Sequence, residues 1–160
     1  MVAANNFVLH IPVLIYNGMV EHILTGYPNE ACGALGSKGN QVVKHYPTAN
    51  AAADKGYRPD DFSIISEADM VRIYNEIDDY DGELIYYHSH PVSEAYPSAR
   101  DIEWAKVGGY LYLIFSLQYH PKPPYARIFK IASDGTVTEG SIELTFAPTL
   151  KRLFGKLIVG

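Results

Sequence analysis

Two short stretches of the sequence combine side chains that bind metal ions. The first holds His88 and His90 on either side of Ser89, and the second, after a short loop, holds Ser98 and Asp101. Residues two apart on a strand project from the same face, so both imidazoles can reach one ion while Ser89 points away. A catalytic zinc takes three nitrogen or oxygen ligands from the protein and leaves the fourth position to water, and Asp101 can supply the third.

Each stretch also has an ordinary structural interpretation. Two histidines around one residue on a strand often form a partly buried polar pair without a metal. The spacing from Ser98 to Asp101 is that of a capping box, which places Ser98 at the N-cap of a helix and Asp101 in its first turn. A helix would then begin close to the metal, but the spacing alone leaves a metal site and a simple helix cap both open.

The elements that must hold these side chains can be predicted from the pattern around them. The run 83–90 is rich in β-branched and aromatic residues and is closed by Pro91, which predicts a strand. The segments that follow are expected to be a helix near 98–107, strands over 110–116 and 125–132, a turn at 133–136 and a strand over 137–146.

The half of the chain before this strand alternates between strand and helix patterns. Apolar residues recur at helical spacing from Val13 to Leu24, after Pro12 and before Gly26, and Ser66 is placed to cap a second helix. The other expected elements are a strand over 7–11, a hairpin of 31–35 with 41–46, a loop over 50–56, an extended piece over 57–62 and an end of the second helix at 81–82. This order favours an α+β fold with a mixed, mostly antiparallel β-sheet flanked by helices.

The composition indicates one ordinary globular domain. The 160 residues are 48% hydrophobic and 19% charged, whereas a disordered chain would be less apolar and more charged. We assign residues 1–147 to this domain and residues 148–160 to a helix-like tail of the same domain, because the apolar side chains of the tail fall on one helical stripe. The tail either folds back on its own core or contacts a partner.

Charge and cysteine content narrow the expected partners and compartment. Thirteen Lys and Arg against eighteen Asp and Glu give a net charge of −5, and the basic residues are scattered, which argues against nucleic acid. The single cysteine, Cys32, excludes an internal disulfide and fits a reducing compartment. Neither a signal peptide nor an apolar run of roughly 20 residues is present, so we expect a soluble, cytoplasmic protein without a membrane partner.

In combination, the two stretches resemble the signature of JAMM (MPN-plus) zinc metallopeptidases, a His-x-His followed at fixed spacing by a Ser and an Asp. The match is position for position, and the similarity runs from the first helix to about Glu143. The resemblance implies a cytidine-deaminase-like JAMM/MPN fold and one zinc ion per chain, held by His88, His90 and Asp101. That family also has a glutamate just after its first helix, and Glu30 corresponds to it.

The resemblance also implies how the site would work. Glu30 would act as the general base on the zinc-bound water, whose pKa zinc lowers to about 7, and would hand the proton to the leaving amine. Ser98 would stabilise the oxyanion through its hydroxyl. Cys32 as a nucleophile paired with a histidine is the weaker alternative, because a lone cysteine among Ala and Gly is usually a small buried hydrophobe.

Within the family, the sequence around the motif looks most like the small bacterial members that act on ubiquitin-like sulfur-carrier proteins. We therefore expect hydrolysis of a peptide or isopeptide bond after the C-terminal Gly-Gly of such a carrier. Glu94 and Tyr96, in the loop beside the expected metal, are candidates for contact with the carrier tail or its leaving group. The alternatives are hydrolysis of short or cell-wall peptides and a non-catalytic MPN scaffold in a complex, and a homodimer also stays open.

Overall fold

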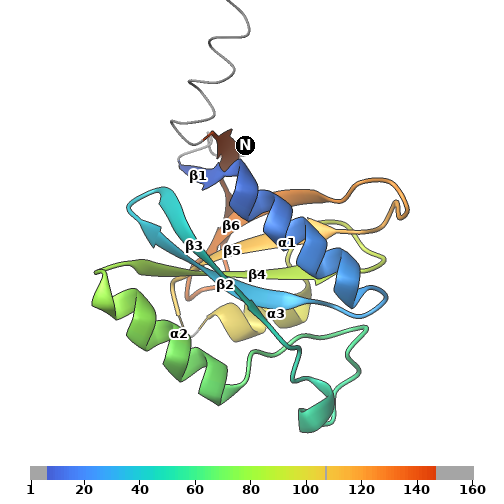
Figure 1. The fold of residues 1–160 in the computed structure, drawn as a ribbon. Helices are drawn as coiled ribbons and strands as arrows, with labels where there is room; N and C mark the ends of the chain where they lie inside the picture. Colours follow the sequence, from blue (N-terminus) through green and yellow to red (C-terminus); the bar gives the residue numbers. More distant parts are fainter. Residues whose placement is uncertain (1–6, 107, 147–160) are drawn as a thin grey trace, which may run out of the picture.

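The computed structural model describes residues 7–106 and 108–146, which form one β-sheet with helices on both of its faces (Figure 1). The elements are β1 (Val8–Pro12), α1 (Val13–Gly26), β2 (Cys32–Lys38), β3 (Gln41–Thr48), the short 3₁₀ helix η1 (Ala53–Lys55), α2 (Glu67–Asp79), β4 (Glu83–His90), α3 (Ala99–Ala105), β5 (Leu111–Ser116), β6 (Tyr125–Ile131), β7 (Val137–Glu139) and β8 (Ser141–Thr145). The predicted α+β fold is confirmed.

The strands of the described residues follow the order β7-β6-β5-β4-β2-β3-β1-β8. Four of the seven neighbouring pairs are antiparallel and three are parallel, so the sheet is mixed and mostly antiparallel, as predicted. β4 lies inside the sheet and has the predicted boundaries. Because Cys32 of β2 pairs with His88 and Ser116 of β5 pairs with His90, the backbone that carries both histidines is fixed from two sides.

The predicted strand over 137–146 is in fact two strands. β7 pairs with β6 at one end of the strand order and β8 pairs with β1 at the other, although only Gly140 separates them. The Gly140 amide donates to the Ile128 carbonyl, and the amide of Ser141 donates to the Phe7 carbonyl. The Phe7 ring occupies the space that a side chain at Gly140 would need, so glycine allows the chain to change partners here.

Two smaller predictions also need correction. β2 extends to Lys38, which confines the hairpin turn to Gly39 and Asn40, and Gly39 has the positive φ of 60° that favours glycine. The piece over 57–62, expected to be extended, contains a turn in which two amides donate to the Arg58 carbonyl. A turn here lets the chain double back towards the face of the sheet that α2 covers.

The predicted helices are present and begin as expected. The hydroxyl of Ser66 accepts a hydrogen bond from the Asp69 amide, so α2 has the predicted N-cap, and α1 ends at Gly26. The helix-like tail predicted for residues 148–160 lies outside the described residues. That tail and the domain boundary at residue 147 therefore stay predictions.

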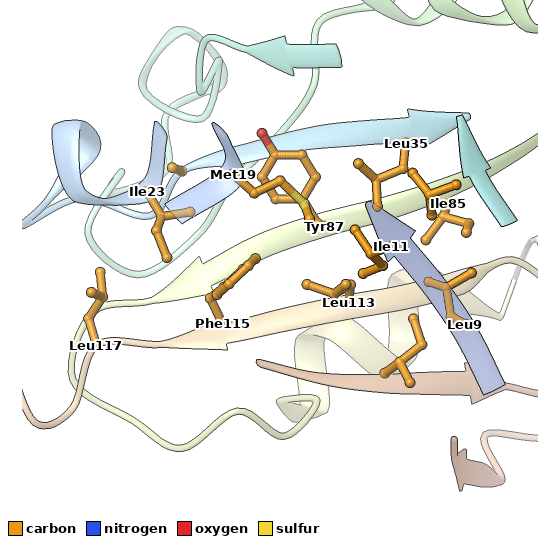
Figure 2. Packing of buried hydrophobic residues seen from close by; sticks show 13 residues of the cluster. Leu9, Ile11, Met19, Ile23, Leu35, Ile85, Tyr87, Leu113, Phe115 and Leu117 are labelled. Carbon is orange, nitrogen blue, oxygen red and sulfur yellow. The ribbon is translucent and has the colours of Figure 1, made fainter. Parts of the chain in front are cut away.

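The two faces of β4 belong to different parts of the core, because alternate side chains point to opposite faces of a strand. Tyr87 packs with α1 side chains such as Met19 in the larger cluster (Figure 2). Leu84 packs instead with side chains of α2 in a second cluster. His88 and His90 have the same parity as Leu84, so both project from the face of the sheet that α2 covers.

The hydroxyl of Tyr87 lies between two histidines on the α1 face. It is 2.6 Å from Nδ1 of His22 and 2.7 Å from Nε2 of His45, while Nε2 of His22 is 3.1 Å from the carbonyl oxygen of Thr48. Because a carbonyl only accepts, His22 carries its proton on Nε2 and its Nδ1 accepts from the tyrosine. His45 then donates through Nε2 to the phenol oxygen, and both rings are neutral in this arrangement.

We expect acidification to destabilise the protein through these two histidines. Burial lowers the pKa of His45 from 6.5 to about 4, with His22 adding to the effect, and burial also lowers the pKa of His22. The unfolded chain takes up these protons near pH 6.5, so the stability they provide is complete above that pH and is lost as the pH falls towards about 4. Since the rings are only partly buried, we expect a loss of about 1–2 kcal/mol.

Urea unfolding at pH 7.5 and at pH 5 measures this loss. The double variant His22→Gln, His45→Gln should lose most of the difference between the two pH values, because glutamine does not titrate in this range. If the double variant retained the full pH dependence, the two histidines would not be its source.

Candidate metal centre

The end of β4 and the start of α3 bring together three side chains of types that can bind a metal ion. The Nε2 atoms of His88 and His90 are 3.0 Å apart, and they lie 3.3 and 3.2 Å from Oδ2 of Asp101. A tetrahedral zinc with bonds of about 2.0–2.1 Å separates its ligand atoms by roughly 3.3–3.4 Å. The two distances to the carboxylate oxygen are close to this value and the nitrogen–nitrogen distance is slightly shorter, so the triangle is close to the size that a single zinc ion requires.

The orientation of His90 also fits a metal ligand. Its Nδ1 lies 2.8 Å from the carbonyl oxygen of Glu94, so Nδ1 carries the proton and donates to that oxygen. The other nitrogen, Nε2, then presents a lone pair to the centre. Metal-binding histidines commonly have this second hydrogen bond, which fixes the ring and its tautomer.

The electrostatics of the three side chains favour the protonation state of a metal ligand at Asp101. Burial alone would raise the pKa of the Asp101 carboxyl, but the neighbouring His88 and His90 hold that pKa well below its usual range. For His88, burial lowers the pKa, but the nearby carboxylates of Asp101 and Glu30 together more than offset this effect, so the pKa is raised. Asp101 is therefore ionised at neutral pH, the form that binds a cation.

The predicted capping box at the start of α3 is confirmed. The Ser98 hydroxyl oxygen accepts from the Asp101 amide at 3.1 Å, and the Ser98 amide donates to Oδ2 of Asp101 at 2.8 Å. The cap thus holds the same carboxylate oxygen that faces the two histidines. Since the Ser98 oxygen acts as an acceptor in the cap, its hydroxyl hydrogen stays available for another group.

Glu30 reaches the centre from the segment that precedes β2. It is 7% exposed, and it forms with His88 and His90 a group whose ligand atoms all lie within 4.8 Å of one another. Burial raises the pKa of the Glu30 carboxyl, although the two histidines act in the opposite direction. Ser63 donates to Oε1 of Glu30 at 3.3 Å, a contact between residues too far apart in the chain to be predicted from sequence spacing.

Ser89, between the two histidines, points away from them and fastens β4 to the segment beside Glu30. Its hydroxyl oxygen accepts from the Ala31 amide at 2.9 Å, and its own amide donates to the Ala31 carbonyl at 2.9 Å. Ser89 is fully buried. This pair of hydrogen bonds sets the position of the glutamate relative to the histidines.

The two residues predicted to contact a substrate tail have different environments. The Tyr96 ring packs edge-on against the Phe129 ring, with the two ring centres 5.4 Å apart. The guanidinium of Arg127 lies 5.6 Å from the centre of the Tyr96 ring. Glu94 has an exposed side chain, and its carbonyl oxygen holds His90. Tyr96 therefore has a packing role as well, whereas the Glu94 carboxylate faces solvent, and contact of either residue with a substrate stays a prediction.

A cavity of about 370 Å³ opens beside His88 and Asp101. Its walls are mainly apolar and aromatic and include Phe62, Ile64, Ile65, Met70, Tyr86, Trp104 and Tyr112. These wall residues could not be found from the sequence, because they come from the connection before α2, from α2 and α3, and from two strands. The cavity is large enough for a few side chains or a short length of peptide rather than a folded protein.

The thiol of Cys32 lies in the core and does not resemble a nucleophile. Its sulfur is 3.6 Å from Oγ1 of Thr48 and 3.8 Å from the Ala49 carbonyl oxygen. Burial raises the pKa of the thiol to about 11, so it is protonated at neutral pH. This environment favours a packing role over the alternative of a catalytic cysteine.

Comparison with known protein families decides the assignment. Residues 13–131 match the family described as prokaryotic homologs of the JAB domain. The chain belongs to this JAB-domain family. The matched region includes Glu30, both histidines, Ser98 and Asp101, and the predicted resemblance to JAMM peptidases is confirmed.

Two relatives of this JAB-domain protein have named activities. The CysO-cysteine peptidase of Mycobacterium tuberculosis is 31% identical over 141 residues, which are 86% of this chain and 92% of that protein. The desampylase of Haloferax volcanii is 38% identical over 93 residues, which are 56% of this chain and 63% of that protein. Family and relatives together identify the JAB-domain protein as a hydrolytic metalloenzyme of the JAMM type.

Two solved structures share the fold of this chain. The solution structure of protein DSY2949 from Desulfitobacterium hafniense is 27% identical and has a TM-score of 0.73, covering 88% of this chain and 94% of that chain. AF2198, a JAB1/MPN domain protein from Archaeoglobus fulgidus, is 12% identical with a TM-score of 0.52 over 87% of this chain and 99% of that chain, and shares the fold. Among residues 7–106 and 108–146 of the JAB-domain protein, no helix is both long and apolar enough to cross a bilayer.

Proposed function

We propose that this JAB-domain protein is a zinc peptidase in which His88, His90 and Asp101 hold one metal ion. The observation that carries the proposal is the triangle of two imidazole nitrogens and one carboxylate oxygen, with Glu30 buried beside it. Imidazole and carboxylate are the ligand types that zinc takes in catalytic sites. Zinc held there would polarise the substrate carbonyl and lower the pKa of a bound water to about 7.

The residues around the ion would then have separate roles in hydrolysis. In this proposal, Glu30 takes a proton from the attacking water and returns it to the leaving amine. Its raised pKa helps, because a base whose pKa is closer to neutral both accepts and releases a proton readily. Ser98, whose hydroxyl oxygen acts as an acceptor in the cap, would donate its hydroxyl hydrogen to the oxygen that becomes negatively charged.

The proposed bond lies after the C-terminal Gly-Gly of a ubiquitin-like or sulfur-carrier protein. Support comes from the relatives named CysO-cysteine peptidase and desampylase. Glycine also suits a tail that must bring its backbone close to a crowded metal centre, because it has no side chain. The exposed carboxylate of Glu94 is the side chain that we propose to meet the tail or its leaving group.

The test uses a sulfur-carrier protein that bears a cysteine or a short extension after its C-terminal Gly-Gly. Incubation with the zinc-loaded enzyme should release the extension, which mass spectrometry detects as a loss of mass from the carrier. Chelation of the metal, or Ala in place of the last Gly, should abolish release. Cleavage of short free peptides together with inertness towards every such carrier would instead indicate a general peptide hydrolase, and inertness towards both with normal zinc binding would indicate a scaffold.

A further inference from the structure

The connection between β3 and α2, residues 49–66, folds around the side chain of Asn50. The Asn50 amide nitrogen donates to the carbonyl oxygens of Glu30 at 3.0 Å and Phe62 at 2.9 Å. A longer contact of 3.4 Å reaches the Pro59 carbonyl oxygen. The amide oxygen of the same side chain accepts from two backbone amides of the connection. One side chain thus organises the connection and joins it to the backbone of Glu30.

The backbone amide and carbonyl groups of Glu30 and of Ala31 are all hydrogen-bonded. The Glu30 amide donates to the Pro59 carbonyl at 2.8 Å, and the Glu30 carbonyl accepts from Asn50. The next residue, Ala31, is held at its amide and at its carbonyl by Ser89. Two of these four groups are therefore anchored to the strand of the histidines, and the other two to the connection that Asn50 organises.

The carboxylate of Glu30 is held by the same connection. Ser63 donates to its Oε1 at 3.3 Å. Ser63 lies between Phe62, whose carbonyl accepts from Asn50, and Ile64, whose amide donates to Asn50 at 3.1 Å. The Asn50 side chain therefore fixes the chain immediately before and after the serine that touches the carboxylate.

We infer that Asn50 is a positioning residue for Glu30, acting through the Glu30 carbonyl and through Ser63. This inference rests on the proposed function, because it gives Asn50 a role only if Glu30 handles the proton in hydrolysis. Geometry of this kind matters because a displacement of about 1 Å at a reacting group can reduce a rate about 100-fold.

The main variant is Asn50→Asp. Aspartate keeps an oxygen that can accept from the two backbone amides. In place of the donating NH₂ group of Asn50 it has a second oxygen, which faces the carbonyl oxygens and cannot donate to them. We expect kcat on the extended carrier protein to fall about 10- to 100-fold, with KM within about threefold of its original value and one zinc retained per chain. Asn29→Asp is the matched control, since it adds the same charge next to Glu30 at an exposed position.

A double-mutant cycle with Glu30→Gln separates positioning from general damage. Single-turnover rates are measured with excess enzyme, so that slow variants remain measurable. If Asn50 acts through Glu30, Asn50→Asp should slow the parent enzyme but change the Glu30→Gln variant less than about twofold. If Asn50→Asp acted by a loss of folding or of metal, its fold-loss in rate would instead multiply with the fold-loss caused by Glu30→Gln.

Ser63→Ala provides a second variant in case Asn50→Asp folds poorly, because it removes only the hydroxyl that touches the carboxylate. We expect the same coupling to Glu30 with a smaller loss in kcat. Equal fold-losses in the parent and in the Glu30→Gln background, or an unchanged kcat in Asn50→Asp, would overturn the inference. A Glu30→Gln variant as fast as the parent would instead refute the proposed role of Glu30 itself.

Discussion

Replacing Glu30 by Gln should reduce turnover about 100-fold or more, with the fold and the zinc content retained. The side chain is buried beside the two histidines, and the exchange keeps its size while removing its ability to accept a proton. Because Gln offers an amide in place of the carboxylate, the attacking water would have no base, although the Lewis acid would remain. Cleavage of the extended carrier and elemental analysis of the same sample measure the two quantities.

The control for this variant is Glu21→Gln, which makes the same chemical change at an exposed position of α1. It should leave the rate unchanged. If Glu30→Gln cleaved as fast as the parent while its zinc content was normal, another group would have to act as the base.

Replacing both His88 and His90 by Ala should remove the zinc and lower activity on the order of 1,000-fold or more, to the background rate. Two of the three proposed ligands are lost, so both the activation of water and the polarisation of the carbonyl disappear together. Elemental analysis should show a fall from about one zinc per chain to none. The variant should keep the secondary structure, because strand pairing on both sides of β4 uses backbone groups.

A matched control for the histidine variant is His10→Ala, which removes an imidazole from β1 without touching β4. Its zinc content and activity should equal those of the parent. Full zinc occupancy in the His88→Ala, His90→Ala variant would show that the metal binds elsewhere. The zinc content and activity of Asp101→Asn should lie between those of His10→Ala and those of the double histidine variant, because Asp101→Asn keeps both imidazole nitrogens but loses the anionic ligand.

Local patterns predicted the elements that carry most of the site. β4 has its predicted limits because β-branched and aromatic residues fill it and Pro91 closes it. The start of α3 follows from the mutual capping of Ser98 and Asp101, which is a short-range interaction that the spacing reveals. The convergence of His88 and His90 follows from the two-residue repeat of a strand.

The position of Glu30 could not be predicted from its own neighbourhood. It reaches the histidines because β2 pairs with β4 in a register that sets Cys32 opposite His88. That register depends on contacts between residues far apart in the chain, and only the family resemblance indicated this glutamate. The roles of Asn50 and Ser63 were missed for the same reason, since neither has a spacing typical of an active-site residue.

The change of partner at Gly140 also determines when the fold can be completed during synthesis. β1 pairs with β3 at a single position, His10 with Gln41, whereas all five residues of β1 pair with β8. Because β8 spans residues 141–145, β1 cannot meet its main partner until the ribosome has made the chain up to residue 145. Contacts between such distant segments close late in folding, since the loop between them must first be ordered. We therefore expect β1 to stay largely unpaired until β8 has been made, and its pairing with β8 to be a late step in folding.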